Sequence, residues 1–249
     1  MIPLYDRNPT KGTPIVTLLL IAACIVIFVF IQPDPGNVEG GEFTYKNAAV
    51  PCEVMQGEPM SLEEITSGDC DAESLDGDRR PFPEKNPYLA ILYSMFLHGS
   101  WLHLGGNMLF LWVFGNNIED TFGKLQYVGF YLLSGLAATV AHIAVDPGST
   151  IPIIGASGAI AGVMGAYLVL YPNVRIHSLI FLGFFVFFRE VGAKWLLGIW
   201  FVLQFFTSPD AGVAWMAHVG GFVFGVAAGF LYRAVKRKDD PRPAAYPGW

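Results

Sequence analysis

The sequence predicts an all-α polytopic membrane protein, a bundle of six transmembrane helices with one long loop after the first helix. Hydrophobic residues make up 53% of the chain and charged residues only 14%, whereas soluble domains usually carry about 25% charged residues. The charges are concentrated outside several long apolar runs, which is typical of a protein that crosses a membrane repeatedly. The formal net charge of −6 is concentrated in one acidic loop. The sequence therefore has no basic footprint for binding nucleic acid.

Six apolar segments account for the expected transmembrane helices. The first, residues 14–31, has 18 residues without a charge, which is long enough to span a bilayer. The fourth, residues 157–170, has only 14 residues. Residues 176–188 are an apolar stretch of 13 residues that we interpret as interfacial or re-entrant, whereas a seven-span arrangement would count them as a helix. The other expected spans are residues 101–116, 125–144, 191–206 and 213–232.

The distribution of Lys and Arg predicts the orientation of these helices. With an even number of spans, both termini lie on the same side of the membrane. Only Lys46, Arg79, Arg80 and Lys85 fall on the opposite side, all in one loop. The positive-inside rule therefore places both termini in the cytoplasm, and we expect a multi-pass protein of the cell membrane. The basic residues on the expected cytoplasmic side are Arg7, Lys11, Lys124, Arg175, Arg189, Lys194, Arg233, Lys236, Arg237, Lys238 and Arg242.

The long loop at residues 32–99 is the one sizeable hydrophilic segment. It contains 13 acidic and 4 basic residues, a local charge of −9. Residues 69–78 are acidic and contain Gly, so we expect irregular backbone there. Cys52 and Cys70 lie on the side of the membrane where disulfides can form, and we expect a bridge between them. The expected division of the chain has five parts. They are a cytoplasmic N-terminal segment (residues 1–13), the first transmembrane helix (14–31), an acidic extracytoplasmic loop (32–99), a core with helices two to six (100–232) and a cytoplasmic tail (233–249).

Three polar residues from three different spans are expected at a similar depth. A helix rises about 1.5 Å per residue, so the fourth span covers about 21 Å of a hydrocarbon core about 30 Å thick. If this span ends at the cytoplasmic face, Ser157 lies on the order of 10 Å below the outer surface. The same rise places His218 about 8 Å and Asn107 about 9 Å deep. Polar groups inside a membrane are costly and therefore candidates for function. A Ser with a His is the minimum set for nucleophilic hydrolysis.

Glycines predict how two of these spans approach each other. Gly158 and Gly162 are four residues apart in the fourth span, and Gly221 and Gly225 have the same spacing in the sixth. Small residues at this spacing let membrane helices pack closely. His218 lies on the same helix face as Gly221 and Gly225. Packing of the two glycine faces would therefore bring His218 against the start of the fourth span.

The second span contains a further polar cluster. His103 and Asn107 are four residues apart, so their side chains face the same way. His98 belongs to the same cluster, and closely spaced His residues can bind zinc. The segment, however, has no His-Glu-x-x-His pattern and no intramembrane carboxylate nearby. We therefore expect an oxyanion donor or a loop anchor here, and neither a metal nor another cofactor.

These clusters occur in order along the chain, within about residues 88–232, and the resemblance that they carry extends over that range. They are His98 and His103-x-x-x-Asn107 in the second span, Gly155-x-Ser157-Gly158 in the fourth, and Ala217-His218-x-x-Gly221-x-x-x-Gly225 in the sixth. Together they resemble the rhomboid family of intramembrane serine proteases. Gly115 and Glu119 are similar to the family's pattern at the cytoplasmic end of the second span.

The resemblance implies a role for each matching residue. Ser157 would be the nucleophile, and His218 would be its general base and later its general acid. His103, Asn107 and the backbone N–H of Ser157 would stabilise the oxyanion. The chain departs from some family members at Ala161, where they carry an aromatic residue that supports the His ring. Packing or water would then orient His218.

The resemblance also implies the substrates. These would be single-span or polytopic membrane proteins, cut within the lipid bilayer. The depth of Ser157 predicts that the cuts lie near the extracytoplasmic ends of their transmembrane segments. The fifth span and the loop at residues 207–215 would gate substrate entry. One alternative is a catalytically silent rhomboid-like protein that binds clients, but it would usually lack the Ser or the His. A transporter is another alternative, but it should show paired carboxylates or broken-helix repeats, which are not evident in the sequence.

Overall fold

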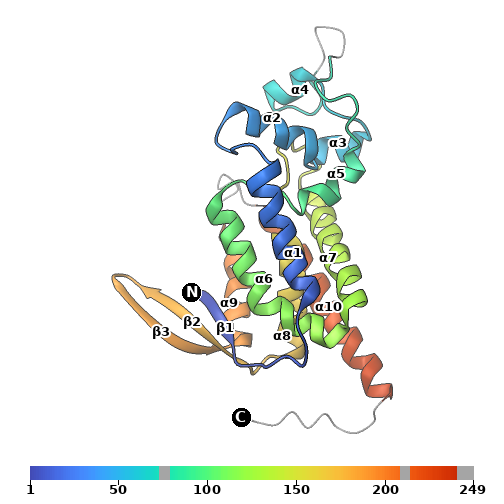
Figure 1. Cartoon of the computed structure of the whole chain (residues 1–249). Helices are drawn as coiled ribbons and strands as arrows, with labels where there is room; N and C mark the ends of the chain where they lie inside the picture. The colour runs from blue at the N-terminus through green and yellow to red at the C-terminus, as the bar shows by residue number, and fades with distance from the viewer. Residues whose placement is uncertain (73–78, 208–213, 240–249) are drawn as a thin grey trace.

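A computed structural model of the chain describes residues 1–72, 79–207 and 214–239. Within these ranges the chain is mostly helical, and the long helices stand side by side as a bundle (Figure 1). Short helices cover one end of the bundle, and a small β-sheet lies toward the other end (Figure 1). The mostly helical class expected from the sequence is therefore confirmed, and the sheet is the main departure from it.

Each apolar segment expected to span a membrane coincides with a helix. Two of these helices, residues 124–145 and residues 215–236, are long and apolar enough to cross a membrane. The apolar helices at residues 15–31, 157–170 and 193–204 are shorter, so the count of six spans stays a prediction. The helices are α1 (Ile15–Val26), which continues into the π-helical turn η1 (Ile27–Ile31), α6 (Trp101–Phe122), α7 (Lys124–Val145), α8 (Ser157–Leu170), α9 (Ala193–Gln204) and α10 (Trp215–Asp239).

α8 is the central helix of the bundle, and all of its residues except Ser157 and Leu168 are buried. It packs against α10, and the two helices are in direct backbone contact. A Cβ added at Gly221 would lie 2.1 Å from the carbonyl oxygen of Gly158, and one added at Gly225 would lie 1.9 Å from that of Gly162. Only glycine permits such an approach. The structure thus places the two glycine faces against each other.

Two strands of a three-stranded antiparallel sheet occupy the segment that we interpreted as interfacial or re-entrant. β1 (Ile2–Asp6) pairs with β2 (Arg175–Leu182), which pairs with β3 (Phe185–Gly192). β2 and β3 are joined by a tight turn in which Gly183 has a φ of 59°, a conformation that favours glycine. The expectation of an all-α fold is wrong here, and the seventh helix is excluded. Residues 176–188 are rich in Ile, Val and Phe, which favour strands when a segment is too short to span a bilayer.

The acidic loop at residues 32–99, which we call the cap, contains four short helices that its composition did not predict. The side chains of Asn37, Ser61 and Asn86 begin three of these helices by accepting hydrogen bonds from backbone N–H groups. Of the segment expected to be irregular, residues 73–78 lie outside the described part of the structure. The four helices are α2 (Val38–Asn47), α3 (Pro51–Gln56), α4 (Leu62–Ser67) and α5 (Pro87–Ser94).

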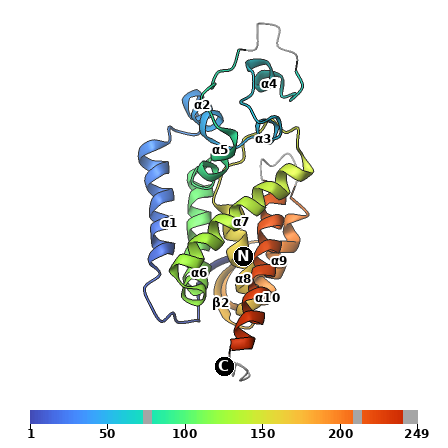
Figure 2. The same ribbon diagram turned by 90° about the vertical axis from the view of Figure 1, so that its right-hand side faces the viewer.

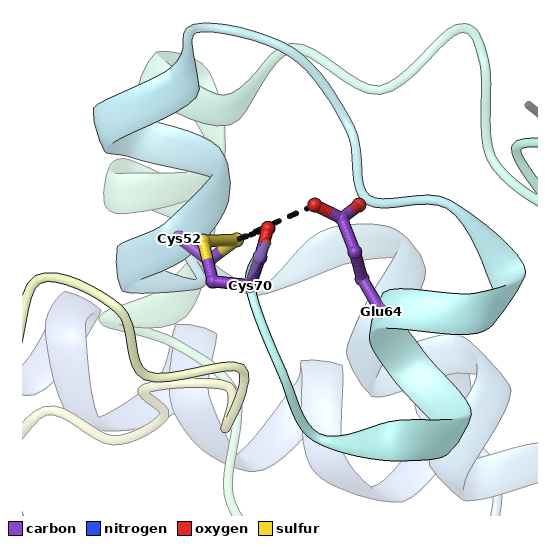
Figure 3. Close-up of side chains that lie close together, drawn as sticks. All are labelled: Cys52, Glu64 and Cys70. Atoms are coloured by element: carbon purple, nitrogen blue, oxygen red, sulfur yellow. Dashed lines mark hydrogen bonds between the residues drawn. A yellow bond between two sulfur atoms is a disulfide. The ribbon is translucent and has the colours of Figure 1, made fainter. Parts of the chain in front are cut away.

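The cap has a small core of its own around Val50, Cys52 and Met60. Sγ of Cys52 and Sγ of Cys70 are joined in a disulfide, 2.08 Å apart, beside the carboxylate of Glu64 (Figure 3). These three residues form the one group of three metal-ligating side chains found among the described residues. Sulfur atoms that are bonded to each other are not thiolate ligands. A disulfide that closes a loop of this length stabilises a fold by about 3 kcal/mol.

A buried ion pair lies beside this core. The side chains of Glu53 and Lys85 are each 2% exposed and are in contact through their charged groups. Burial raises the pKa of Glu53 and lowers the pKa of Lys85, and the attraction between the two charges opposes both changes. Loss of either partner would leave a buried charge without compensation. The pair therefore ties α3 to the segment that leads into α5.

The cap fixes the irregular chain that precedes α8. The backbone N–H of Ile153 donates to the carbonyl oxygen of Ala49 at 2.8 Å, and that of Gly155 donates to the carbonyl oxygen of Ser94 at 2.9 Å. The hydroxyl oxygen of Ser94 accepts from the backbone N–H of Ala49 at 2.7 Å. Backbone polar groups of irregular chain need such partners where water is scarce. The start of α8 is thereby held at the end of the bundle nearest the cap.

Candidate active site

Ser157 and His218 face each other across the contact between α8 and α10. Ser157 is the first residue of α8, and His218 lies in the first turn of α10. Nε2 of His218 lies 2.8 Å from Oγ of Ser157, which is hydrogen-bonding distance. A Cβ added at Gly158 would lie 3.7 Å from the carbonyl oxygen of Ala217, so the residues adjoining the pair are packed together as well. The structure thus brings together the Ser and His singled out in the sequence.

The sequence placed the start of the sixth span at residue 213, which lies outside the described residues, and α10 begins at Trp215. His218 is therefore close to the helix end, at the same level as the start of α8. Figure 2 shows α10 running alongside α8 and α9. Three neighbouring helices can thus contribute side chains to one site.

The other ring nitrogen of His218 contacts Gln204, a residue that sequence reasoning missed. Nδ1 of His218 lies 2.7 Å from Oε1 of Gln204, at the end of α9. The Trp200 ring, one turn earlier on α9, lies 5.7 Å from the His218 ring between centroids. The aromatic contact that Ala161 cannot supply from α8 therefore comes from α9. An amide within an apolar span is costly, and that signal could have identified Gln204.

His103 and Asn107 lie beside the chain that leads into α8. A Cβ added at Gly155 would lie 2.7 Å from Nε2 of His103 and 3.6 Å from Nδ2 of Asn107. Gly155 also has a φ of 120°, which disfavours any other residue. Nδ2 of Asn107 is buried and has no hydrogen-bond partner among the described residues. Such a free donor is suited to an oxyanion that forms only during a reaction.

The start of α8 adds further donors. The N-cap residue Ala156 provides no side-chain hydrogen bond to the helix. The first backbone N–H groups of α8, beginning with that of Ser157, have no carbonyl partner within the helix. Aligned peptide dipoles give this end of the helix a partial positive charge. Negative charge that develops near Ser157 would therefore be stabilised.

A cavity of about 1030 Å³ adjoins these residues. Ser157, His218, His103 and Asn107 all contribute to its lining. His142 of α7 lies in the same wall, and its Nδ1 is buried without a hydrogen-bond partner among the described residues. Sequence reasoning gave His142 no role in a site. The cavity is large enough for a peptide segment and for the water that hydrolysis requires.

Gly115 and Glu119, which are similar to a family pattern, lie at the opposite end of α6 from His103. The buried carboxylate of Glu119 accepts hydrogen bonds from the backbone N–H groups of Val16 at 3.0 Å and Thr17 at 2.8 Å. These N–H groups belong to the first turn of α1, where donors lack helical partners. Glu119 therefore caps and docks α1 and takes no part in the cavity.

Comparisons with known proteins show which family the chain is similar to. The rhomboid-domain family model matches residues 85–235, a range that includes Ser157 and His218. Rhomboid protein 1, mitochondrial, of Saccharomyces cerevisiae is 29% identical over 175 residues, which are 65% of this chain and 47% of that protein. Presenilin-associated rhomboid-like protein, mitochondrial, of Bos taurus is 33% identical over 143 residues, 55% of this chain and 36% of that protein.

RHOMBOID-like protein 5 of Arabidopsis thaliana is 29% identical over 153 residues, which are 61% of this chain and 46% of that protein. The chain thus spans less than half the length of each of these relatives. The family model, in contrast, matches residues 85–235, which are more than half of this chain. The chain belongs to the rhomboid family.

Proposed function

We propose that this protein is an intramembrane serine endopeptidase in which Ser157 is the nucleophile and His218 is the general base. The observation that carries the proposal is the 2.8 Å separation of Ser157 Oγ and His218 Nε2 in the wall of a cavity. A hydroxyl is a weak nucleophile until a neighbouring base accepts its proton. Membership of a family whose members are generally serine proteases supports the same assignment.

The proposed reaction begins with attack of Ser157 Oγ on the carbonyl carbon of a substrate peptide bond. His218 Nε2 accepts the hydroxyl proton, and the carbonyl oxygen becomes an oxyanion. The backbone N–H of Ser157 and the side chains of Asn107 and His103 stabilise this negative charge. His218 then gives the proton to the departing amine, so the peptide bond breaks and an acyl-enzyme remains.

The second half of the reaction releases the other product. Water in the cavity attacks the ester carbonyl, and His218 Nε2 accepts a proton from it. The second oxyanion collapses, His218 returns the proton to Ser157 Oγ, and the carboxylic acid product leaves. No step requires a metal or another cofactor, since the protein groups supply the base, the acid and the oxyanion donors.

The proposed topology has six spans with both termini in the cytoplasm of a cell-membrane protein. Arg7 follows β1, Arg189 lies in β3, Lys124 begins α7, and Arg233 lies in the last part of α10. The sheet and these ends of α7 and α10 lie away from the cap, which supports this orientation. The cap and the start of α8 then face the extracytoplasmic side. Two of the relatives are named as mitochondrial proteins, and that location is a property of those proteins.

The proposed substrates are membrane proteins with a transmembrane segment that unwinds near its extracytoplasmic end. A continuous helix hides its carbonyl groups in i→i−4 hydrogen bonds, so Ser157 cannot reach them. Gly weakens a helix by about 1 kcal/mol and Pro by about 3 kcal/mol relative to Ala. Segments with Gly, Pro or polar residues near that end should therefore be preferred. A silent client-binding protein would hold the same segments without cutting them.

A direct test is to replace the nucleophile. Ser157→Ala should abolish both the labelling of the purified protein by a fluorophosphonate probe and the cleavage of transmembrane substrates. Ser67→Ala, an exposed serine of α4, is the matched control and should keep both properties. Cleavage by the Ser157→Ala protein would disprove the mechanism. Substrate binding without labelling or cleavage by the unmodified protein would favour the client-binding alternative.

A further inference from the structure

The buried amide of Gln204 is a polar group in contact with His218 that the proposed reaction does not yet use. Gln204 is 8% exposed and ends α9, on the side of the helix that faces His218. Its Nε2 donates to the carbonyl oxygen of Trp200 at 2.9 Å, which turns its Oε1 toward the His218 ring. Both ends of the amide are therefore hydrogen-bonded. Its orientation follows from these bonds, because only the nitrogen can donate to a carbonyl.

This orientation determines which nitrogen of His218 carries a proton. An amide oxygen can only accept a hydrogen bond, so the Nδ1 atom 2.7 Å away must be the donor. In the neutral imidazole the other nitrogen, Nε2, is then unprotonated and can accept from the Ser157 hydroxyl at 2.8 Å. The opposite tautomer would place two acceptors, Nδ1 and Oε1, against each other. It would also leave Nε2 unable to take the proton of Ser157.

We infer that Gln204 is the positioning residue of this enzyme: it holds His218 as the Nδ1–H tautomer and fixes the direction in which Nε2 points. The inference rests on the proposed function and extends the pair to Ser157, His218 and Gln204, contributed by α8, α10 and α9. A neutral amide serves in the third position of a Cys-His-Asn site in the same way. An amide also avoids the cost of burying a carboxylate in an apolar bundle.

The same contact assists the charged intermediate. When His218 holds the proton of Ser157, the imidazolium gains a stronger hydrogen bond to Oε1 of Gln204 than the neutral ring had. Trp200 limits rotation of the ring but offers no acceptor toward Nδ1. The other titratable groups lining the cavity are His103, His142 and Asp146, and the hydrogen bond to Nδ1 of His218 comes from none of them. Gln204 is therefore the acceptor that the structure provides for Nδ1–H among the described residues.

Two substitutions separate positioning from packing. Gln204→Leu keeps the approximate volume and removes the acceptor, so we expect kcat to fall on the order of 10- to 100-fold with little change in KM. Gln204→Glu keeps an acceptor oxygen and should recover much of that loss, although a carboxyl group in the bundle lowers thermal stability. Its pH profile should also differ, because an ionised carboxylate favours protonated His218 and moves the acid limb of kcat to higher pH.

A purely structural role predicts the opposite ranking. The apolar Leu variant would then be as active as the unmodified protein, and the Glu variant would be the impaired one. Leu133→Ala, at an exposed position of α7, is the matched control and should leave kcat and the pH profile unchanged. Full kcat in Gln204→Leu alongside an inactive Ser157→Ala protein would overturn the inference while leaving the proposed function intact.

A spectroscopic measurement tests the inference even if proteolysis is not observed. Nitrogen-15 NMR of imidazole-labelled full-length protein in detergent distinguishes the two neutral tautomers of His218, with His218→Gln used to assign its signal. We expect Nδ1–H in the unmodified protein and in Leu133→Ala, and a loss of this preference in Gln204→Leu. An Nε2–H tautomer in the unmodified protein, or no change in Gln204→Leu, would contradict the inference.

Discussion

Some side chains of the site have hydrogen-bond partners in the resting protein, and at least one does not. His218 has a partner on each ring nitrogen, Ser157 at 2.8 Å and Gln204 at 2.7 Å. Nδ2 of Asn107, in contrast, is buried without a partner among the described residues. Leaving a buried donor unsatisfied costs about 1–3 kcal/mol. The resting protein tolerates this cost because, in the proposed reaction, the N–H group of Asn107 gains its hydrogen-bond acceptor only when an oxyanion forms.

The proposed role of Asn107 predicts a specific kinetic defect. Asn107→Ala removes one oxyanion donor, so turnover should fall on the order of 10²-fold while substrate binding changes little. Asn116→Ala, on the same helix but near its opposite end, is the control and should retain turnover. Steady-state kinetics with several transmembrane substrates measure the effect. Equal turnover in both variants would assign Asn107 to packing.

Among the structural elements, the contact between α8 and α10 determines the geometry of the Ser–His pair. Gly158, the residue after Ser157, contacts Gly221 through its carbonyl oxygen. One turn further along the helices, the carbonyl oxygen of Gly162 contacts Gly225 in the same way. Because Ser157 and His218 stand at the start of these two helices, any separation of the helices lengthens the 2.8 Å contact between them. The glycines therefore support both the stability of the bundle and the proposed reaction.

A single added methyl group should test this contact. Gly225→Ala places a Cβ 1.9 Å from the carbonyl oxygen of Gly162, so backbone must move. Overpacking of this kind costs about 1–3 kcal/mol or more, and both thermal stability and proteolysis should decrease. Gly129→Ala, where a Cβ would meet nothing within 4 Å, is the matched control and should be neutral or slightly stabilising. Similar melting temperatures for the two variants would contradict close packing.

The molecule as a whole is asymmetric along the axis of the bundle. The cap covers one end and is fastened to the chain before α8 by the Ala49, Ser94, Ile153 and Gly155 contacts. The sheet lies toward the other end (Figure 1). The proposed site is at the cap end, because both Ser157 and His218 are at the starts of their helices. The position of the site along the bundle therefore determines which part of a substrate can reach it.

This asymmetry predicts where substrates are cut. In a panel of membrane proteins incubated with the purified protein, cut sites mapped by mass spectrometry should cluster near the extracytoplasmic ends of transmembrane segments. Replacing helix-weakening Gly or Pro residues near those ends with Leu should slow cleavage, because the segment then unwinds less readily. The same replacements near the cytoplasmic ends serve as the control. Cuts clustered at the cytoplasmic end would show that the proposed orientation is wrong.

Much of this protein follows from its sequence alone. Apolar segments long enough to be helices located the start of every long helix to within two residues, because hydrophobic periodicity is a property of contiguous chain. The ends were less accurate, since α6 and α10 extend six and seven residues beyond the expected spans. The three clusters around Asn107, Ser157 and His218 were recognisable for the same reason as the helix starts. Each motif is local, and a costly polar group in an apolar segment is visible without a partner.

Other features depended on contacts between distant segments. The sheet forms because β1 reaches β2 from more than 160 residues away, and residues 176–188 carry too little local signal to distinguish a strand from an interfacial helix. The short helices α2, α3 and α4 of the cap pack around Cys52 and Met60, and α5 packs against Ala49, in spite of an acidic composition. The contact between Gln204 and His218 exists only because α9 and α10 pack side by side. Tertiary structure decided these features because hydrogen-bond partners and burial are set by neighbours in space and not by neighbours along the chain.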